Sequence, residues 1–263
     1  SMIIQARDVC IYFSLIKKGE FKDIYEGIKN HEKFEEETYK KELNKTKSNI
    51  VTLFDSDYPE VYKQIDKPPL ALYYYGNINL LKSKKILAVV GTRYPDNYGI
   101  QSLKEILEPF VKDENVTLIS GLAKGIDGVA SRIFMENNKP VISVLGSGID
   151  CCYPEINNDV YSYCKSKNGL VISEYPNSTA PFAHHFPFRN RLIAAISDII
   201  LIGEAKYKSG SQSTLTYGLN FGKTICTIPA SIFNSYKLNN NLLAQGANVI
   251  TCADDLKMLF DKD

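Results

Sequence analysis

The feature that most constrains the fold is a regular alternation of short apolar runs and helical patterns from Lys84 onward. The apolar runs are typical of buried β-strands and lie at residues 86–91, 116–121, 140–146, 169–175, 198–205 and 224–230. Between them, stretches such as QSLKEILEPFVK and GIDGVASRIFMENNK repeat apolar residues at helical spacing. Strands that alternate with helices form right-handed βαβ units in a mostly parallel sheet. We therefore predict a doubly wound α/β fold, closed by an NVI strand and an ADDLKMLF helix.

The first 50 residues have a different character. Phe21, Ile24, Tyr25 and Ile28 recur at helical spacing, and the following HEKFEEETYKKELNKTK is dense in both signs of charge. Such a charge run is typical of a solvated helix face. We predict a small, charged helical region at residues 1–50 and the α/β domain at residues 51–263, the domain opening with an extended lead-in and a short helix.

Composition excludes several classes of protein. There are 31 Lys and Arg against 30 Asp and Glu, so the net charge of +1 excludes a histone-like polycation but permits a local basic site. No run approaches the roughly 18 apolar residues that cross a bilayer, and the first residues lack a signal-peptide pattern. The six cysteines form no CxxC pair, which is typical of reduced thiols in the cytosol. We expect a cytoplasmic protein without a membrane partner.

Small residues follow four of the predicted strands, all at one edge of the sheet. The turns are Gly91-Thr92-Arg93, Ser120 to Gly125 with Gly121 and Lys124 inside it, Gly146-Ser147-Gly148, and Ser209-Gly210-Ser211. Ligands of open α/β sheets bind outside the carboxyl ends of the strands, where small residues let the backbone approach closely. We interpret Arg93 as a phosphate ligand in preference to an ion-pair partner of Asp127. Lys124 fits a phosphate ligand and a solvated lysine equally well.

The segment from residue 181 to residue 223 gives the strongest signal for an anion site. Arg189 and Arg191 stand where we predict a helix to begin, at an end that already has roughly half a positive charge from its peptide dipoles. Two guanidinium groups there are unfavourable unless an anion lies opposite them. Ser209, Gly210 and Ser211 open the next helix with free N–H groups, which are suited to phosphate.

An aromatic loop with two histidines precedes these arginines. Phe182, Phe186 and Phe188 alternate around His184 and His185. We expect one or two of the phenylalanines to pack on the sheet, and Phe186 to present a ring face to a nucleic-acid base. Neighbouring histidines without a Cys or His partner at ligand spacing do not indicate a metal site, so we expect no metal and interpret them as a polar wall of a ligand groove.

The sequence does not match the known catalytic and nucleotide-binding motifs, because the candidate stretches have the wrong spacing. Gly146-Ser147-Gly148 lacks the third glycine of a dinucleotide fingerprint, and GLNFGKT at 218–224 is one residue short of a P-loop and ends a helix. A Gly-x-Ser-x-Gly elbow is absent. Glu174 and Glu204 end two predicted strands; they either accept backbone N–H groups and pair with an arginine, which we favour, or form a carboxylate pair for glycosidic cleavage. We expect no catalytic residue and no cofactor.

Taken together, these stretches resemble the DNA-processing protein A family (DprA, also called Smf). The resemblance covers about residues 51 to 252 and rests on VTLFDSDYP, PPLALYYYGN, AVVGTRYPDNYG, SGLAKGIDGVAS, VLGSGIDCCYPEIN, GLVISEYP, FPFRNRLIAAIS and EAKYKSGSQST. It implies an extended Rossmann-like domain that binds single-stranded DNA and helps load the RecA recombinase, notably during natural transformation. It also implies a homodimer without established catalytic activity.

The resemblance further implies which residues bind DNA. The arginine of the GTR motif contacts phosphates in the family, which corresponds to Arg93, and the phenylalanine three residues before RNR lies near a base, which corresponds to Phe186. The complete expected set is Gly91, Thr92, Arg93, Gly121, Lys124, Phe186, Arg189, Asn190, Arg191, Ser209, Gly210 and Ser211. Lys124 stands where the family usually has arginine, which keeps the charge but loses the bidentate geometry.

We therefore predict a single-stranded DNA-binding recombination mediator with a focused anion pocket. The alternative from another class is a nucleotide-binding enzyme or sensor of the kind of cytokinin-activating nucleoside monophosphate phosphoribohydrolases, which share this fold. Their mark is a PGGxGT-type loop, and the corresponding KSGSQST lacks it. A third possibility is a scaffold whose pocket binds no ligand.

Overall fold

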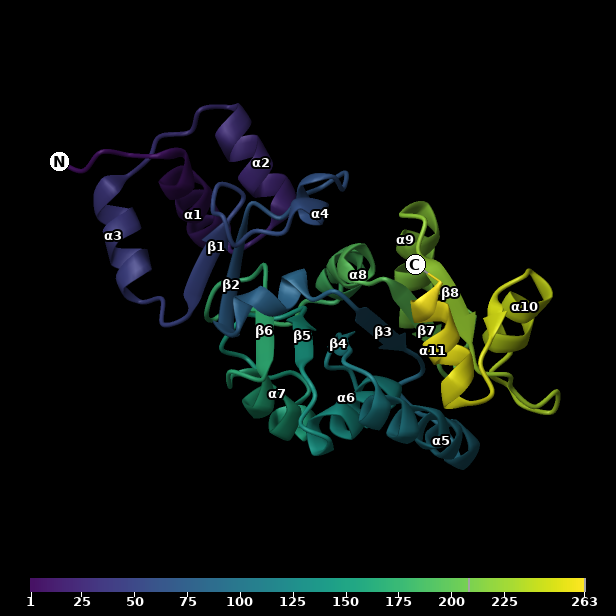
Figure 1. Ribbon diagram of the computed structural model, residues 1–263. Helices are drawn as coiled ribbons and strands as arrows, with labels where there is room; N and C mark the ends of the chain where they lie inside the picture. The colour runs from purple at the N-terminus through teal and green to yellow at the C-terminus, as the bar shows by residue number, and fades with distance from the viewer. Residues whose placement is uncertain (208, 263) are drawn as a thin grey trace.

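The computed structural model describes residues 1–207 and 209–262 and contains a nine-stranded sheet (Figure 1). Its strands, in chain order, are β1 (Asn49–Thr52), β2 (Ala71–Gly76), β3 (Ile86–Val90), β4 (Thr117–Ser120), β5 (Val141–Leu145), β6 (Gly169–Ser173), β7 (Ile199–Ile202), β8 (Thr224–Thr227) and β9 (Asn248–Val249). The spatial order is β1-β2-β6-β5-β4-β3-β7-β8-β9. β2 pairs antiparallel with β1 and β6, and the other pairs are parallel. The predicted mostly parallel α/β sheet is confirmed, and each predicted run from residue 86 to residue 230 contains one strand.

Helices cover both faces of the parallel strands. One face packs against α5 (Asn97–Asp113), α6 (Ile126–Glu136), α7 (Asn158–Cys164) and α11 (Ala253–Asp261), and the other against α4 (Glu60–Lys63), α8 (His185–Ile196), α9 (Gly210–Asn220) and α10 (Leu238–Ala244). In β3, Leu87 and Val89 join the first cluster, whereas Ile86, Ala88 and Val90 join the second. Because successive side chains of a strand point to opposite faces, a run that is apolar throughout forms a strand that is covered on both faces.

Three helices precede the first strand and pack at the β1–β2 end of the sheet (Figure 1). They are α1 (Ala6–Ile16), α2 (Phe21–Lys29) and α3 (Glu36–Asn44), and two short 3₁₀ helices follow later at Ile78–Lys82 and Glu155–Asn157. On α1, Ile11 and Phe13 enter the same apolar cluster as α5 and α6. The hydroxyl groups of Ser14 and Tyr73 lie 2.8 Å apart and are buried. The N-terminal helices are thus continuous with the core of the sheet.

The order of the strands reverses at β3, which places a switch point between β3 and β7. β4, β5 and β6 follow β3 on one side, and β7, β8 and β9 lie on the other. Gly91 allows the two carboxyl ends to meet, because a Cβ there would lie 2.8 Å from the carbonyl oxygen of Glu204. The N–H of Thr92 donates to that same oxygen at 2.6 Å. In doubly wound folds, a switch point of this kind is where ligands bind.

Two expectations from composition can be compared with the structure. All six cysteines are free thiols, and Cys10, Cys164 and Cys226 are buried. Among residues 1–207 and 209–262, no helix combines the length and the apolar character that crossing a bilayer requires.

Candidate nucleic-acid interface

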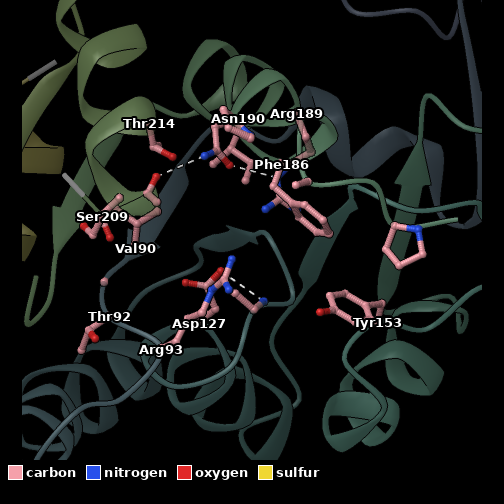
Figure 2. A pocket seen from close by; sticks show the side chains of 18 of the residues that line it. Val90, Thr92, Arg93, Asp127, Tyr153, Phe186, Arg189, Asn190, Ser209 and Thr214 are labelled. Atoms are coloured by element: carbon pink, nitrogen blue, oxygen red, sulfur yellow. Dashed lines mark hydrogen bonds between the residues drawn. The ribbon is translucent and has the colours of Figure 1, made fainter. Parts of the chain in front are cut away.

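A cavity of about 510 Å³ opens beyond the carboxyl ends of the central strands (Figure 2). Its size falls in the range of about 300–1,000 Å³ that is usual for ligand sites. The residues expected to bind DNA that line it are Gly91, Thr92, Arg93, Phe186, Arg189, Asn190, Ser209, Gly210 and Ser211. The fold therefore brings the turn after β3 together with the N-terminal parts of α8 and α9.

Arg93 lies on the turn after β3 and is exposed at the cavity. The arginine ion pairs of the described chain join Arg7, Arg132 and Arg191 to carboxylates, and Arg93 is not in one of them. The alternative interpretation of Arg93, an ion pair with Asp127, is therefore not what the described residues form. Its positive charge is available to a ligand.

Arg189 is a buried cation on the opposite wall (Figure 2). Its Nη1 donates to the carbonyl oxygens of Gly121 at 2.9 Å and Val144 at 2.6 Å, and its Nε donates to Oδ1 of Asn190 at 2.9 Å. Burial lowers the pKa of Arg189 to about 10, so the group stays charged at neutral pH. A buried charge is unfavourable unless a counter-charge lies near it; Asp127 supplies one, and the exposed Arg93 leaves an excess positive charge that an anion in the cavity would balance.

Gly121 and Lys124 do not line the cavity. A Cβ on Gly121 would lie 2.8 Å from Cζ of Arg189, so this glycine acts by leaving room for the guanidinium. Lys124 is exposed on the loop between Gly121 and Gly125. Gly121 thus supports Arg189 from behind, and the expectation that Gly121 and the exposed Lys124 bind DNA stays a prediction.

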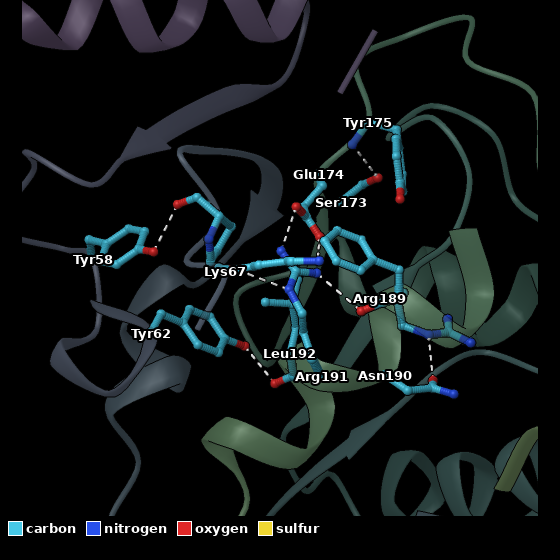
Figure 3. A network of polar contacts seen from close by, with 12 residues as sticks. Tyr58, Tyr62, Lys67, Ser173, Glu174, Tyr175, Arg189, Asn190, Arg191 and Leu192 are labelled. Carbon is cyan, nitrogen blue, oxygen red and sulfur yellow. Dashed lines mark hydrogen bonds and ion pairs between the residues drawn. The ribbon is translucent and has the colours of Figure 1, made fainter. Parts of the chain in front are cut away.

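Arg191 was expected to bind phosphate, and the structure gives it another partner (Figure 3). Its Nη1 and Nη2 donate to the two carboxylate oxygens of Glu174 at 2.5 and 2.8 Å. Its Nε donates to the carbonyl oxygen of Lys67 at 3.1 Å, and its Cζ lies 3.7 Å from the centroid of the Phe188 ring. Residues two apart on a helix point about 200° apart, so Arg191 faces away from the cavity when Arg189 faces into it.

The start of α8 also differs from the prediction. The helix begins at His185, so Arg189 and Arg191 lie in its second turn and not at its first residues. The field of a helix terminus falls off within the first turn. The attraction of this wall for an anion therefore follows from two cations, Arg93 and Arg189, beside the carboxylate of Asp127, and not from the helix dipole.

Phe186 presents an aromatic face at the cavity. Its ring packs against Gly146, where a Cβ would lie 2.7 Å from Cδ1 of the ring. The ring centroid of Tyr153, a residue that is 49% exposed, lies 5.8 Å away, and Cζ of Arg189 lies 5.5 Å away. Phe188 instead packs between Arg191 and Phe21, as expected for one of the phenylalanines. Sequence reasoning missed Tyr153, although it follows β5 at the same edge of the sheet.

The N-terminus of α9 forms the third wall. Nδ2 of Asn190 donates to the carbonyl oxygen of Gly210 at 3.3 Å and to Oγ of Ser213 at 2.6 Å, which ties α8 to α9. Ser211 is buried and lines the cavity, and its Oγ has no hydrogen-bond partner in the described part of the chain. Free N–H groups at a helix start, together with an unpartnered hydroxyl, suit a phosphate oxygen.

The two carboxylates that follow predicted strands at this edge have structural bonds. Glu174 pairs with Arg191, and Glu204 accepts from the N–H of Asp96 at 2.9 Å and from Nδ2 of Asn234 at 3.0 Å. Burial and the neighbouring Asp96 raise the pKa of Glu204 to about 7. These contacts confirm the structural interpretation of Glu174 and Glu204.

Asp127 is the acidic residue of the cavity wall. Its Oδ2 accepts from the N–H groups of Gly121 at 3.2 Å and Ala123 at 3.4 Å, the role in the first turn of a helix that its position predicts. Burial raises the pKa of Asp127 to about 6, although the charge of Arg189 and the backbone bonds lower it. At neutral pH the wall therefore has one negative charge beside two positive ones.

The two histidines do not line the cavity. His185 is buried, with Nδ1 2.9 Å from the carbonyl oxygen of Gly146 and Nε2 2.6 Å from Oε1 of Glu20. His184 contacts the same carboxylate oxygen. The interpretation of the pair as a polar wall of the groove is corrected, and no local pattern in the sequence indicates Glu20 as their partner.

Comparison with known proteins identifies the family of this chain. The model of a family described as DNA recombination-mediator protein A matches residues 49–261. DNA processing protein DprA of Streptococcus pneumoniae (strain ATCC BAA-255 / R6) is 34% identical over 211 residues, 80% of this chain and 73% of that protein. Protein Smf of Synechocystis sp. is 35% identical over 215 residues, 79% of this chain and 52% of that protein.

Solved structures of DNA processing protein A superpose on this chain. The X-ray structure of DNA processing protein A from Streptococcus pneumoniae superposes with a TM-score of 0.81 at 28% identity over 98% of both chains. A structure of DNA processing protein A from Helicobacter pylori, which concerns its single-stranded DNA binding mode, superposes with a TM-score of 0.72 at 28% identity over 82% of this chain and 98% of that one. The chain belongs to the DNA recombination-mediator protein A family.

Proposed function

We propose that this protein binds single-stranded DNA in the cavity and acts as a recombination mediator. The observation that carries the proposal is the convergence of two cations, Arg93 and Arg189, with the aromatic ring of Phe186 and the open N-terminus of α9 on one cavity. Single-stranded DNA supplies phosphates for the two cations and for the N-terminus of α9, and it supplies unpaired bases for the ring of Phe186. The relative from Helicobacter pylori, whose structure concerns single-stranded DNA binding, supports the same ligand class.

In the proposed complex, one phosphate lies between Arg93 and Arg189, and the next base stacks on Phe186. The N–H groups of α9 and the hydroxyl of Ser211 donate to the oxygens of a neighbouring phosphate. Bases in a duplex are paired and stacked on one another, so they present no free face to Phe186. The cavity therefore favours single strands over duplex DNA.

The cellular part of the proposal rests on family membership. We infer that the bound strand is passed to a RecA-type recombinase, that the active form is a homodimer, and that the setting is cytoplasmic recombination and DNA uptake in natural transformation. A site that contacts few phosphates suits this role, because a mediator must release the strand that it delivers.

A nucleotide-cleaving activity is the alternative from another class. Such a reaction needs a carboxylate or another base that is free to act on the substrate. Glu174 is paired with Arg191, Glu204 is hydrogen-bonded to Asp96 and Asn234, and Asp127 accepts two backbone N–H groups. These bonds support a binding site. Incubation with AMP is expected to release no free adenine, and release above background would favour the alternative.

Fluorescence anisotropy with labelled oligo-dT and with a duplex of equal length tests the proposal. Arg93→Glu is expected to weaken oligo-dT binding at least tenfold, because a hydrogen bond to a charged group contributes about 1.5–3 kcal/mol and the reversed charge adds repulsion. Lys112→Glu is the matched control. It reverses an equal charge near the C-terminal end of α5, the helix that follows Arg93, about 20 Å from the start of that helix at 1.5 Å per residue. Equal affinity for both DNAs, or equal effects of both substitutions, contradicts the proposal.

A further inference from the structure

A cluster of metal-ligating side chains lies outside the cavity, where the start of α8 meets the N-terminal helices. Oε1 of Glu20 is 2.6 Å from Nε2 of His185 and 2.9 Å from Nε2 of His184. One ligand atom from each of the three side chains lies within 4.8 Å of the others. Glu20 immediately precedes α2, and His184 immediately precedes α8. Sequence spacing alone could not assemble this set, because its third member comes from 164 positions away.

The hydrogen bonds of His185 define which of its nitrogens is free. Nδ1 lies 2.9 Å from the carbonyl oxygen of Gly146, and a carbonyl only accepts, so Nδ1 holds the proton. In the neutral ring, Nε2 then has a lone pair directed at Oε1 of Glu20, which is also an acceptor. A metal-bound histidine commonly donates its other N–H to a backbone carbonyl in this way, which fixes the ring and leaves the second nitrogen for the metal.

The second histidine strengthens the case for a shared cation. His184 and His185 both direct Nε2 at the same oxygen, and their ring centroids are 4.5 Å apart. His184 can donate from Nε2 as a neutral ring, whereas His185, whose Nδ1 already holds a proton, donates from Nε2 only as an imidazolium in its buried position. One divalent cation satisfies the three ligands with both rings neutral.

Aromatic packing orients the two imidazole rings before any cation binds, and it fixes the buried ring of His185 most firmly. The ring of Tyr175 stacks on His185 with centroids 3.7 Å apart and 13° between the planes, and Phe182 stacks on His184 at 5.9 Å and 19°. The side chain of His185 is fully buried, whereas that of His184 is 65% exposed. Tetrahedral zinc sites have bonds of about 2.0–2.2 Å, so their ligand atoms are roughly 3.3–3.5 Å apart. Rotation of Glu20 and of the exposed His184 ring opens the present contacts to that spacing.

We propose that Glu20, His184 and His185 bind one divalent transition-metal ion, with Zn²⁺ as the best-fitting class. Two imidazoles and a carboxylate suit Zn²⁺ better than Mg²⁺ or Ca²⁺, which prefer oxygen ligands. The fourth position faces the exposed side of His184 and takes water. The ion joins the start of α2 to the start of α8, the helix that also positions Phe186 and Arg189. This inference goes beyond the proposed DNA binding, and its test needs no DNA.

Isothermal titration of chelator-treated full-length protein with ZnCl₂ tests the site. We expect one ion per chain, and binding at least tenfold weaker in Glu20→Gln and in His184→Asn. His31→Asn is the matched control, because His31 is exposed in the N-terminal region and its backbone φ of 53° suits asparagine. Since His184 is exposed, its substitution leaves the fold intact, which circular dichroism checks.

Two further readouts separate the site from adventitious binding. Co²⁺ substituted for Zn²⁺ is expected to give the visible bands of nitrogen and oxygen ligands without the near-ultraviolet charge-transfer band of a thiolate, which excludes Cys151, Cys152 and Cys252. Zn²⁺ is expected to raise the melting temperature of the unmodified chain and of His31→Asn, but not of His184→Asn. Absence of binding at micromolar Zn²⁺, a thiolate band, or unchanged binding in both ligand variants overturns the proposal.

Discussion

The buried ion pair between Arg191 and Glu174 yields the sharpest prediction, because it separates a structural arginine from a DNA ligand. Both side chains are almost fully covered, with 3% and 5% of their surfaces exposed. Arg191→Met removes the guanidinium and retains most of the apolar stem against Phe188. Glu174 then stays buried without its two charged hydrogen bonds.

The expected loss of stability is large. Removing one partner of a buried ion pair costs about 3–5 kcal/mol, because the other charge is left without compensation. For a chain of this size, each kcal/mol lowers the melting temperature by about 2–4 °C, so we expect a decrease of roughly 6–20 °C. In the double variant with Glu174→Gln, the uncompensated charge is gone, and much of the stability should return.

Urea unfolding followed by circular dichroism measures the two single variants and the double variant as a thermodynamic cycle. Oligo-dT affinity is measured at a temperature where every variant is folded. We expect Arg191→Met to bind DNA within about twofold of the unmodified chain, since Arg191 does not line the cavity. A tenfold loss of DNA affinity at unchanged stability would refute the assignment and restore Arg191 as a phosphate ligand.

Three further predictions concern the cavity. The slope of log K against log salt changes by about 0.7 for each phosphate contact of a single strand, so Arg93→Ala should make it shallower by about 0.7 and Arg191→Met should leave it unchanged. Asp127 has a pKa raised to about 6, so its carboxylate is ionised at pH 7.5 and mostly neutral at pH 5.5. Oligo-dT affinity should therefore increase as the pH falls between these values, and Asp127→Asn should abolish the dependence. An equal pH dependence in the variant contradicts this prediction. Gly146→Ala should displace the Phe186 ring and weaken binding as Phe186→Ala does, by about 1–3 kcal/mol, and wild-type affinity in the glycine variant would argue against ring stacking.

The sheet could be predicted from the sequence because its signal is local. A parallel strand that is covered on both faces must be apolar at every position, as ILAVV of β3 is, and a glycine turn follows it wherever the backbone needs room. The common edge of the turns then follows from the parallel direction of the strands. Arg93 and Ser211 are predicted in this way to lie at one edge of the sheet, and both line the cavity.

The partners of charged groups could not be predicted, because they depend on which distant segments meet. Arg189 and Arg191 lie only two positions apart in the sequence, and the face of α8 on which each lies decides that one borders the cavity and the other pairs with Glu174. Because α8 starts at His185, four residues before Arg189, neither arginine lies in the first turn where the helix dipole acts. Glu20, which immediately precedes α2, cannot be identified as a partner of the histidines from the sequence around them.

The reversal of strand order at β3 has a mechanical consequence for the whole molecule. β3 and β7 belong to halves of the sheet that grow in opposite directions, and the amide of Asn190 links α8, which follows β6 in one half, to α9, which follows β7 in the other. If DNA binds in this cavity as proposed, it contacts residues of both halves, and hydrogen exchange is expected to slow in strands that the DNA does not touch. The outer edges of the sheet would then respond to DNA binding at its centre.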